Sequence, residues 1–282
     1  MKDRHIIKAS LGSLLCMFVL LTGCCFNLGC TIMLGKYERS VELSAPLSPG
    51  STFAAKTHNG SITIHGGEVA ECHLTATIVT RAGTDEEAQE LSDQVSVTLV
   101  PSGDRLTAKI DQPTRLINKS VSVSYDIHLP NQTNLELETH NGAVSVVEIN
   151  GHVNATTHNG KTTAENVTGN TTLTTHNGSV DCREISGDAK LHTHNGSVEV
   201  VYSEAAPSVC DVSIVTHNGG IDFTAPPNFS ARVNASTSNG SVHTDLPITV
   251  TGKVSKNKLT GTIGAGGGDL YLETHNGSIK IR

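Results

Sequence analysis

The chain repeats the tetrapeptide Thr-His-Asn-Gly seven times, and this repeat constrains its fold more than any other feature. The copies occupy residues 57–60, 139–142, 157–160, 175–178, 193–196, 216–219 and 274–277, and a degenerate eighth copy, Thr-Ser-Asn-Gly, occupies residues 237–240. Four successive histidines, His140, His158, His176 and His194, are each separated by 18 residues. A constant period near 20 residues is typical of a solenoid, in which each repeat forms one coil that stacks on its neighbours.

Each repeat contains two short segments in which apolar or small residues alternate with polar ones. In the repeat that begins at Val153, the alternation runs over residues 153–157, breaks at the Asn-Gly pair 159–160, and resumes over residues 162–167. Alternation of this kind predicts strands with one buried face. The polar residues between the inward positions are expected to face water.

Asn-Gly is also a strong hairpin signal, so an antiparallel meander is the competing architecture. The constant spacing of 18 residues favours a coil, because a coil returns to the same position once per repeat and stacks identical residues in register. We therefore predict an all-β fold, a single-chain parallel β-solenoid (β-helix) with coils of about 18 residues and one short N-terminal helix. We expect a right-handed coil, although the spacing itself does not determine the hand.

The Asn-Gly pairs are predicted to form the corners of the coils. Asn and Gly both tolerate positive φ, and stacked Asn side chains can hydrogen-bond along the axis. The corner residues predicted from the motif are Asn141, Gly142, Asn159, Gly160, Asn177, Gly178, Asn195, Gly196, Asn218, Gly219, Asn276 and Gly277.

The sequence predicts four segments along the chain. Residues 1–23 read as a signal peptide and residues 24–45 as a tether. Residues 46–130 are expected to form an N-terminal β region that caps the solenoid, and residues 131–282 the repeat solenoid itself. Within the cap, Thr84 and Glu87 resemble a capping box, so we predict a short amphipathic helix over residues 84–95.

The N-terminus carries an export signal that resembles the lipobox of bacterial lipoproteins. A charged start is followed by an apolar run over residues 9–21, and Leu21-Thr22-Gly23 precede Cys24. The resemblance implies cleavage before Cys24 and its lipidation, with membrane attachment through the lipid. Cys25 stands where lipoprotein sorting rules place Asp for retention, which favours the outer membrane. An ordinary signal peptide and an uncleaved anchor are the alternatives.

Charge argues against nucleic acid as a partner. The chain has a formal net charge of −7, and removal of residues 1–23 takes away three basic residues and one acidic residue, a net of +2, which leaves −9. The compartment permits disulfides. Cys182 and Cys210 fall on inward positions and are interpreted as small buried hydrophobic residues, while the disulfide status of these two and of Cys72 is left open.

The chain resembles the DUF4097-like family of bacterial cell-surface proteins, which are described as adhesins of unknown function with a β-helical fold. The resemblance covers roughly residues 45–282. It is carried by the recurrent Thr-x-Asn-Gly-x-[Val/Ile] corners, by residues 121–130 leading into 135–137, and by the glycine-rich segment 264–267 followed by 270–281. The resemblance implies a β-helical lipoprotein of the cell envelope. Its motifs are structural and imply no chemistry.

The repeated histidine is the main candidate site. Strands stack about 4.8 Å apart, so the histidines should form an outward column whose rings stack or share a divalent transition metal. The alternative is a tolerated exposed residue copied by duplication, which we favour because no carboxylate alternates with the column. The candidate residues are His140, His158, His176, His194, His192 and His217. Repulsion between stacked imidazolium rings predicts that acid lowers stability through pH ~6 to 5.

The sequence is compatible with three functions. The first is a non-enzymatic, lipid-anchored envelope protein that binds other surface molecules and needs no cofactor. The second is uptake of zinc, copper or nickel by the histidine column. The third, which we disfavour, is a polysaccharide-acting enzyme, because the acidic residues Asp181, Glu184, Asp188 and Glu199 are scattered rather than clustered. With aromatic residues at 3% and no tryptophan, the chain gives little support for sugar binding by aromatic platforms.

Overall fold

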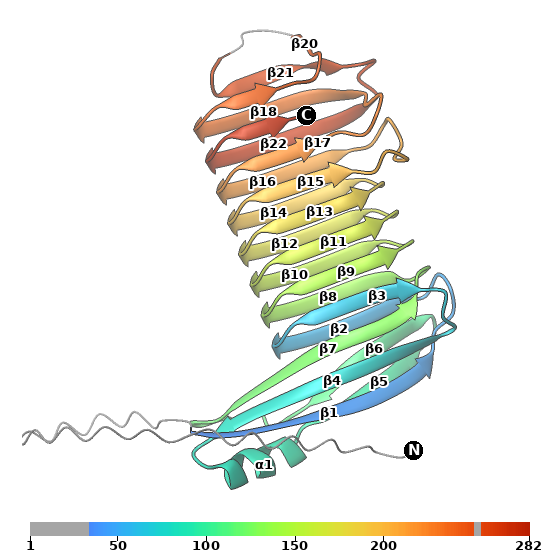
Figure 1. Ribbon diagram of the computed structural model, residues 1–282, viewed down its shortest axis with the longest axis vertical. Coiled ribbons are helices and arrows are strands. Elements are labelled where there is room, and N and C mark those ends of the chain that lie inside the picture. The colour runs from blue at the N-terminus through green and yellow to red at the C-terminus, as the bar shows by residue number, and fades with distance from the viewer. Residues whose placement is uncertain (1–33, 251–254) are drawn as a thin grey trace, which may run out of the picture.

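The computed structural model describes residues 34–250 and 255–282, which form two facing sheets built mainly from parallel strands. The strands stack in layers along the long axis of the molecule (Figure 1). The expected signal peptide, Cys24 and the first part of the expected tether lie outside the described residues. Within the described ranges, no helix is long and apolar enough to cross a membrane.

Sheet A has eleven strands among the described residues. In spatial order they are β1 (Gly35–Pro46), β4 (Glu71–Ala82), β7 (Ser120–Pro130), β3 (Ile62–Gly67), β9 (Val144–Ile149), β11 (Thr162–Val167), β13 (Val180–Ile185), β15 (Val198–Tyr202), β17 (Ile221–Thr224), β23 (Ile279–Ile281) and β19 (Val242–Thr244).

Sheet B has twelve strands in the same part of the chain. In spatial order they are β20 (Thr249–Val250), β21 (Lys258–Ile263), β18 (Ala231–Asn239), β22 (Gly268–Asn276), β16 (Val212–Asn218), β14 (Ala189–Asn195), β12 (Thr171–Asn177), β10 (Val153–Asn159), β8 (Asn134–Asn141), β2 (Thr52–Asn59), β6 (Arg105–Asp111) and β5 (Ser96–Ser102).

Equivalent residues of successive repeats lie directly over one another. Val153 of β10 pairs in parallel with Thr171 of β12, and Thr171 pairs in the same way with Ala189 of β14. The corresponding strands of sheet A, β11 and β13, also pair in parallel. The parallel arrangement predicted from the repeat is confirmed, and the antiparallel meander is wrong for this part of the chain. The space between the sheets is filled by one continuous apolar core.

The threonine of each motif faces inward and is buried. In every motif after the first, its Oγ1 donates a hydrogen bond to the carbonyl oxygen of the motif glycine in the neighbouring coil, as from Thr157 to Gly142 at 2.9 Å and from Thr175 to Gly160 at 3.0 Å. Thr57 of the first motif donates instead to the carbonyl oxygen of Val123 in β7, at 2.8 Å. A buried hydroxyl without a partner costs free energy. The bond therefore explains how a polar residue is accommodated inside every coil.

The asparagine side chains form a continuous ladder at the corners, as predicted. Beyond Asn59, each Nδ2 donates to the Oδ1 of the asparagine in the adjacent coil, at distances of 2.7–2.8 Å, and Asn59 at the end of the ladder donates to the carbonyl oxygen of Val121. In spatial order the ladder contains Asn59, Asn141, Asn159, Asn177, Asn195, Asn218, Asn276 and Asn239.

The expectation that positive φ explains the Asn-Gly corners is wrong for most of them. Among the corner residues described, only Gly60 and Gly277 have positive φ, at 143° and 158°. Close packing explains the glycine instead, because a Cβ on Gly160 would overlap the carbonyl group of Gly142 in the coil beside it. The same overlap recurs along the corner, so the stacking distance leaves no room for a side chain.

Left-handed backbone occurs in sheet A instead. Glu148, Asn166 and Glu184 have φ of 61°, 55° and 53°, and each precedes the last buried residue of its strand. A residue in this conformation lets two consecutive side chains face outward before the chain turns inward again. These residues mark the bend that closes each coil on the side opposite the Asn-Gly corner.

The tether expected over residues 24–45 is wrong in its second half. Strand β1 begins at Gly35 and pairs antiparallel with β4 along its whole length, from Gly35 opposite Ala82 to Pro46 opposite Glu71. Its alternate residues Val41, Leu43 and Ala45 pack against the core, and this packing explains why the segment is a strand. Strands β1, β4 and β7 form the antiparallel end of sheet A.

The predicted short helix is confirmed as α1 (Asp85–Asp93), at the N-terminal end of the stack. Thr84 caps it, because its Oγ1 accepts a hydrogen bond from the Glu87 amide at 3.2 Å. Ala88 and Leu91 are buried against strands β1 and β4. The helix therefore covers the end of the N-terminal region, as expected of a cap.

Spatial order departs from sequence order at both ends of the solenoid. The first motif lies in β2 and joins β8 directly, and β3 joins β9 in the same way, so β2 and β3 form the first coil of the solenoid. The cap expected over residues 46–130 is therefore wrong for this segment, and the cap consists of β1, β4, α1, β5, β6 and β7. The last motif lies in β22, which inserts between β16 and β18. The hairpin strand β21 then pairs antiparallel with the outer edge of β18. This arrangement covers an edge that would otherwise be open to another chain.

Candidate functional site

Seven imidazole rings form one continuous stack on the outer face of sheet B. Adjacent ring centroids are 4.7–4.9 Å apart, and the ring planes differ by 1–21°. In spatial order the column contains His58, His140, His158, His176, His194, His217 and His275. We call this set the histidine column. Each ring lies between an inward threonine and a corner asparagine of its own motif.

The structure brings together five of the six predicted candidates as neighbours in the column. The sixth, His192, is exposed on the same face but two residues before His194, where it pairs in register with Thr174 and Val215. The column also includes His58 and His275, which were not among the predicted candidates. Both carry the same motif, but their irregular spacing in sequence concealed that they complete the stack.

Protonation of one interior ring of the column, His194, is disfavoured. Partial desolvation lowers the pKa of His194 below its usual range, and repulsion from protonated His176, His217 and His192 lowers it further. A neutral imidazole presents one donor and one acceptor nitrogen. The lowered pKa therefore favours the neutral, hydrogen-bonding form of the His194 ring.

The stacked geometry does not favour a shared metal ion. Two nitrogens bound tetrahedrally to one ion, each at about 2.1 Å, lie about 3.4 Å apart. Rings related by translation keep equivalent nitrogens at the ring spacing, which is 4.8 Å between His176 and His194. In the described ranges, no group of three metal-binding side chains falls within the column. Metal uptake there requires the stack to open.

An open groove of about 780 Å³ runs beside the histidine column. Its lining includes column rings from His58 to His176, the outward Thr156 and Thr174, and Lys109 near the end of β6. Strand β6 pairs with β2 only as far as Ala108, and the groove lies where that pairing ends. The lining is mainly hydroxyl and imidazole groups, which suit a partner recognised by hydrogen bonds.

One ion pair lies within the groove. Lys56 Nζ is 2.7 Å from Glu138 Oε1, and both side chains are exposed. An exposed pair of this kind contributes little to stability, so these two charges remain available to a bound partner.

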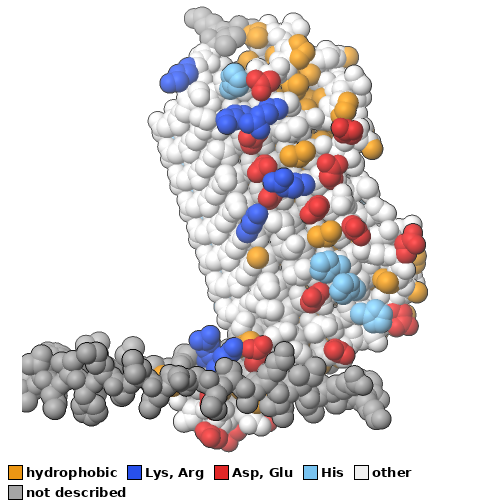
Figure 2. All heavy atoms as spheres, viewed as in Figure 1, with side chains coloured by type: hydrophobic (Ala, Val, Ile, Leu, Met, Phe, Trp, Pro, Cys, Tyr) orange, Lys and Arg blue, Asp and Glu red, His pale blue; other side chains and the backbone are white. Residues whose placement is uncertain are grey.

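Two acidic residues on the outer face of sheet A, Asp181 and Glu199, form ion pairs with basic residues. Arg183 contacts Asp181 at 3.1 Å and Glu199 at 2.9 Å, and Lys161 contacts Asp181 at 3.2 Å. Figure 2 shows Lys, Arg, Asp and Glu side chains following one another along the stack on the face in view. Because these carboxylates lie along a surface rather than around a cleft, they do not resemble the acid–base pair of a glycosidase or lyase.

The three described cysteines are buried and free, which agrees with their interpretation as small core residues. Burial raises the pKa of the Cys72 thiol to about 12 and that of Cys210 to about 11. A thiol acts as a nucleophile in its ionised form. Neither residue is therefore suited to covalent catalysis.

The sequence analysis missed a second group of histidines on the outer face of sheet A. His65 of β3 lies beside Asp126 and His128 of β7, and the three ligand atoms lie within 4.8 Å of one another. The spacing Asp126-x-His128 predicts that these two side chains share a face of a strand. Nothing local to His65 indicates that β3 pairs with β7, because about 60 residues separate them.

A family model described as Toastrack DUF4097 matches residues 38–282. This match covers both the N-terminal cap and the whole solenoid. A search of curated proteins finds no match.

Solved structures with a similar arrangement come from several bacteria. A "putative cell adhesion protein" from Clostridium sporogenes is 16% identical, with a TM-score of 0.38 over 86% of this chain and 98% of that chain. A "putative adhesin" from Bacteroides fragilis is 11% identical, with a TM-score of 0.41 over 86% of this chain and 97% of that chain. A "putative lipid binding protein" from Parabacteroides distasonis is 10% identical, with a TM-score of 0.31 over 86% and 96% of the respective chains. These similarities are too distant to carry a ligand or an activity over to this chain.

Proposed function

The chain belongs to the Toastrack DUF4097 family, and from that premise we propose that it is a non-enzymatic scaffold of the bacterial cell envelope that binds other surface molecules. The binding surface in this proposal is the outer face of sheet B, along the histidine column and the groove beside it. The observation that carries the proposal is the groove itself, an open site lined mainly by threonine hydroxyl and imidazole groups that repeat from coil to coil.

The repeat suggests the shape of the partner. Thr156 and Thr174 occupy the same position in adjacent coils, next to the rings of His158 and His176. A surface that presents the same groups at every coil, about 4.8 Å apart, suits an extended partner aligned with the solenoid axis. We also propose that the coils are right-handed and contain about 18 residues each. The coil length is supported by the pairing of β10, β12 and β14, in which residues 18 positions apart lie opposite one another.

Absence of catalysis is part of the same proposal. The protonated buried thiols and the ion-paired carboxylates of sheet A support it. Metal uptake by the histidine column, the alternative function, is not favoured by the 4.7–4.9 Å ring spacing.

We further propose that the protein is held on the membrane, in the outer membrane where the cell has two, by lipid on Cys24. Because β1 begins at Gly35, the tether would be confined to residues 25–34. Gly35 packs against the backbone at the start of α1, so the anchor would leave the protein at the cap and the coils would project away from the membrane. Labelling of cells with an alkyne fatty acid tests this, since the label should enter the wild-type protein and not Cys24→Ala.

A matched pair of substitutions on one strand tests the binding surface. Thr174→Lys places a long side chain in the groove, whereas Thr172→Lys places it on the same face of β12 but outside the groove lining. Full-length protein carrying either change should be compared with wild type for capture of material from its own envelope fraction. We expect capture to fall with Thr174→Lys and to persist with Thr172→Lys. Equal capture by all three proteins would contradict the proposed surface.

A further inference from the structure

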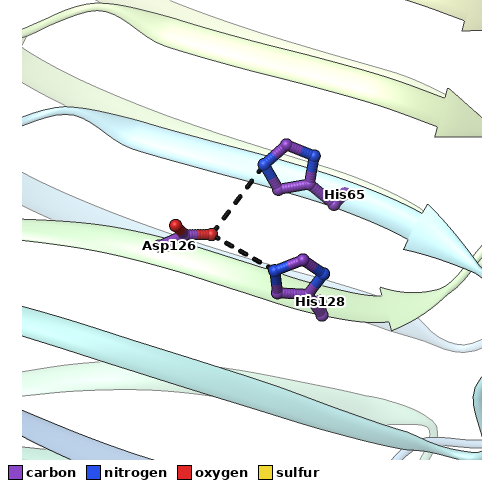
Figure 3. A group of neighbouring side chains, drawn as sticks. All are labelled: His65, Asp126 and His128. Carbon is purple, nitrogen blue, oxygen red and sulfur yellow. Dashed lines mark ion pairs between the residues drawn. The ribbon is translucent and has the colours of Figure 1, made fainter.

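A compact His-Asp-His group lies at the junction between the cap and the first coil, on the outer face of sheet A. His65 is on β3, the sheet A strand of the first coil, and Asp126 and His128 are on β7, the last strand of the cap. The two strands pair in parallel, with His65 opposite His128 and Thr63 opposite Asp126. The register therefore places both rings side by side and the carboxylate next to them (Figure 3).

The distances from the two rings to the carboxylate are close to those of a ligand set. The Nε2 atoms of His65 and His128 lie 3.9 Å and 3.6 Å from the same oxygen, Asp126 Oδ1. The two rings stack with centroids 4.9 Å apart. Ligands of a tetrahedral ion at about 2.1 Å lie about 3.4 Å apart. Contraction by a few tenths of an ångström, through rotation of exposed side chains, brings each ring to that distance from the carboxylate. The three ligand atoms lie within 4.8 Å of one another, so the two exposed rings must also tilt out of their stack to bring their nitrogens together. Asp126 lies within reach of both rings and gives them a shared ligand that the histidine column lacks.

We propose that His65, Asp126 and His128 bind one divalent first-row transition ion. Two imidazole nitrogens and one carboxylate oxygen form a ligand set that suits first-row transition ions. The same set does not suit Ca²⁺ or Mg²⁺, because these ions favour oxygen ligands. Three protein ligands leave a fourth position for water. The carboxylate also supplies the negative charge that the histidine column lacks, and this distinguishes the two groups of histidines.

The group is open to solvent, so an ion has access to it. The side chains of His65, Asp126 and His128 retain 40%, 60% and 60% of their exposure. No helix or loop has to move for the ligands to converge, because register alone sets their positions. The bound ion would join β3 to β7, two strands that are distant in sequence, and would stabilise the junction of cap and coil by binding the folded state alone.

The site is tested by calorimetric titration of the full-length chain with Zn²⁺ at pH ~7.5. We expect one ion to bind, with affinity reduced about tenfold or more in Asp126→Asn and in His128→Gln. His176→Gln is the matched control, because it removes one imidazole from the middle of the histidine column, and its affinity should equal that of wild type. Co²⁺ provides a second readout, since a site with imidazole and carboxylate ligands gives visible absorption bands that should disappear in Asp126→Asn.

Three results would overturn the site: no Zn²⁺ binding by wild type, unchanged binding in both Asp126→Asn and His128→Gln, or an equal loss in His176→Gln. Circular dichroism of each variant checks that the fold is intact. Exposed positions on a sheet tolerate such changes. The groove substitution Thr174→Lys should leave Zn²⁺ binding unchanged, so failure of the metal site and failure of the binding surface are distinguishable.

Discussion

The side-chain amide of Asn159 donates a 2.7 Å hydrogen bond to Oδ1 of Asn141, the asparagine 18 residues earlier in the chain. The same bond joins every adjacent pair of motif asparagines in the described part of the chain. Each asparagine inside the ladder is therefore both a donor and an acceptor. The hydrogen bond therefore connects residues that are one repeat apart in the sequence and one coil apart in the structure.

Removal of one member of this ladder should destabilise the solenoid. Asn177→Ala eliminates the bond to Asn159 and the bond from Asn195, at about 1 kcal/mol each. We expect the melting temperature to fall by about 4–8 °C. Asn154→Ala is the control, because Asn154 is outward on β10 and outside the ladder. Equal melting temperatures for the two variants would contradict a structural role of the ladder.

Close packing of the corners makes their glycines sensitive to a single methyl group. Gly160→Ala directs a Cβ into the carbonyl group of Gly142, so adjacent coils must separate. We expect a loss of about 2–3 kcal/mol or more of unfolding free energy, measured in urea. Gly67→Ala is the matched control, since its Cβ meets no atom within 4 Å. A similar urea midpoint for both variants would argue against the observed coil spacing.

Two buried threonines should respond in opposite directions to the same change. Thr175 Oγ1 donates to the Gly160 carbonyl at 3.0 Å, whereas Thr162 Oγ1 is buried without a hydrogen-bond partner. Thr175→Val should lower stability by about 1 kcal/mol, because it removes a satisfied hydrogen bond. Thr162→Val should raise stability by about 1 kcal/mol, since it removes an unpaired hydroxyl.

The neighbours of Thr162 support the second half of this prediction. Thr162 pairs in register with Val144 and Val180, so valine suits its position. Chemical denaturation of the two variants gives the sign of each effect. Destabilisation by Thr162→Val would show that its hydroxyl has a partner.

Acid should destabilise the fold through the histidine column. Because the pKa of His194 is lower in the folded protein than its ordinary value of about 6.5, the unfolded chain binds the proton more readily. Stability is therefore fully present above pH ~6.5 and is lost as the pH falls toward the lower folded value. The groups that face His194 and oppose its protonation are His176, His217 and His192.

The measurement is the melting temperature at pH ~7.5 and pH ~5 for wild type and His194→Thr. We expect the drop on acidification to be smaller in the variant, which lacks the ring whose pKa is lowered. An identical pH dependence in both proteins would contradict repulsion within the column.

The sequence predicted what the motif repeats and missed what distant segments bring together. Thr157, His158 and Asn159 were placed correctly as inward, outward and corner residues, because strand alternation and constant spacing are local properties. The exact period also predicted which rings would stack from His140 to His194. The role of Gly160 was misjudged, since overlap with another coil is not visible in a single repeat.

Three-dimensional order at the ends of the solenoid could not be deduced from spacing. His275 stacks on His217, although the degenerate motif at Ser238 lies between them in sequence. The insertion of β22 between β16 and β18, and the pairing of β21 with β18, are tertiary contacts. For the same reason, the pairing of β3 with β7 and the meeting of His65 with Asp126 carry no signal in either segment alone.

The distance between the two ends of the histidine column tests the stacking of the coils most directly. Nitroxide labels at His58→Cys and His275→Cys, with Cys16, Cys24, Cys25 and Cys30 replaced by serine, allow this distance to be measured by pulsed electron resonance. Six ring spacings of 4.7–4.9 Å predict a narrow distribution near about 29 Å. A broad distribution, or a distance beyond about 45 Å, would contradict the stacked column.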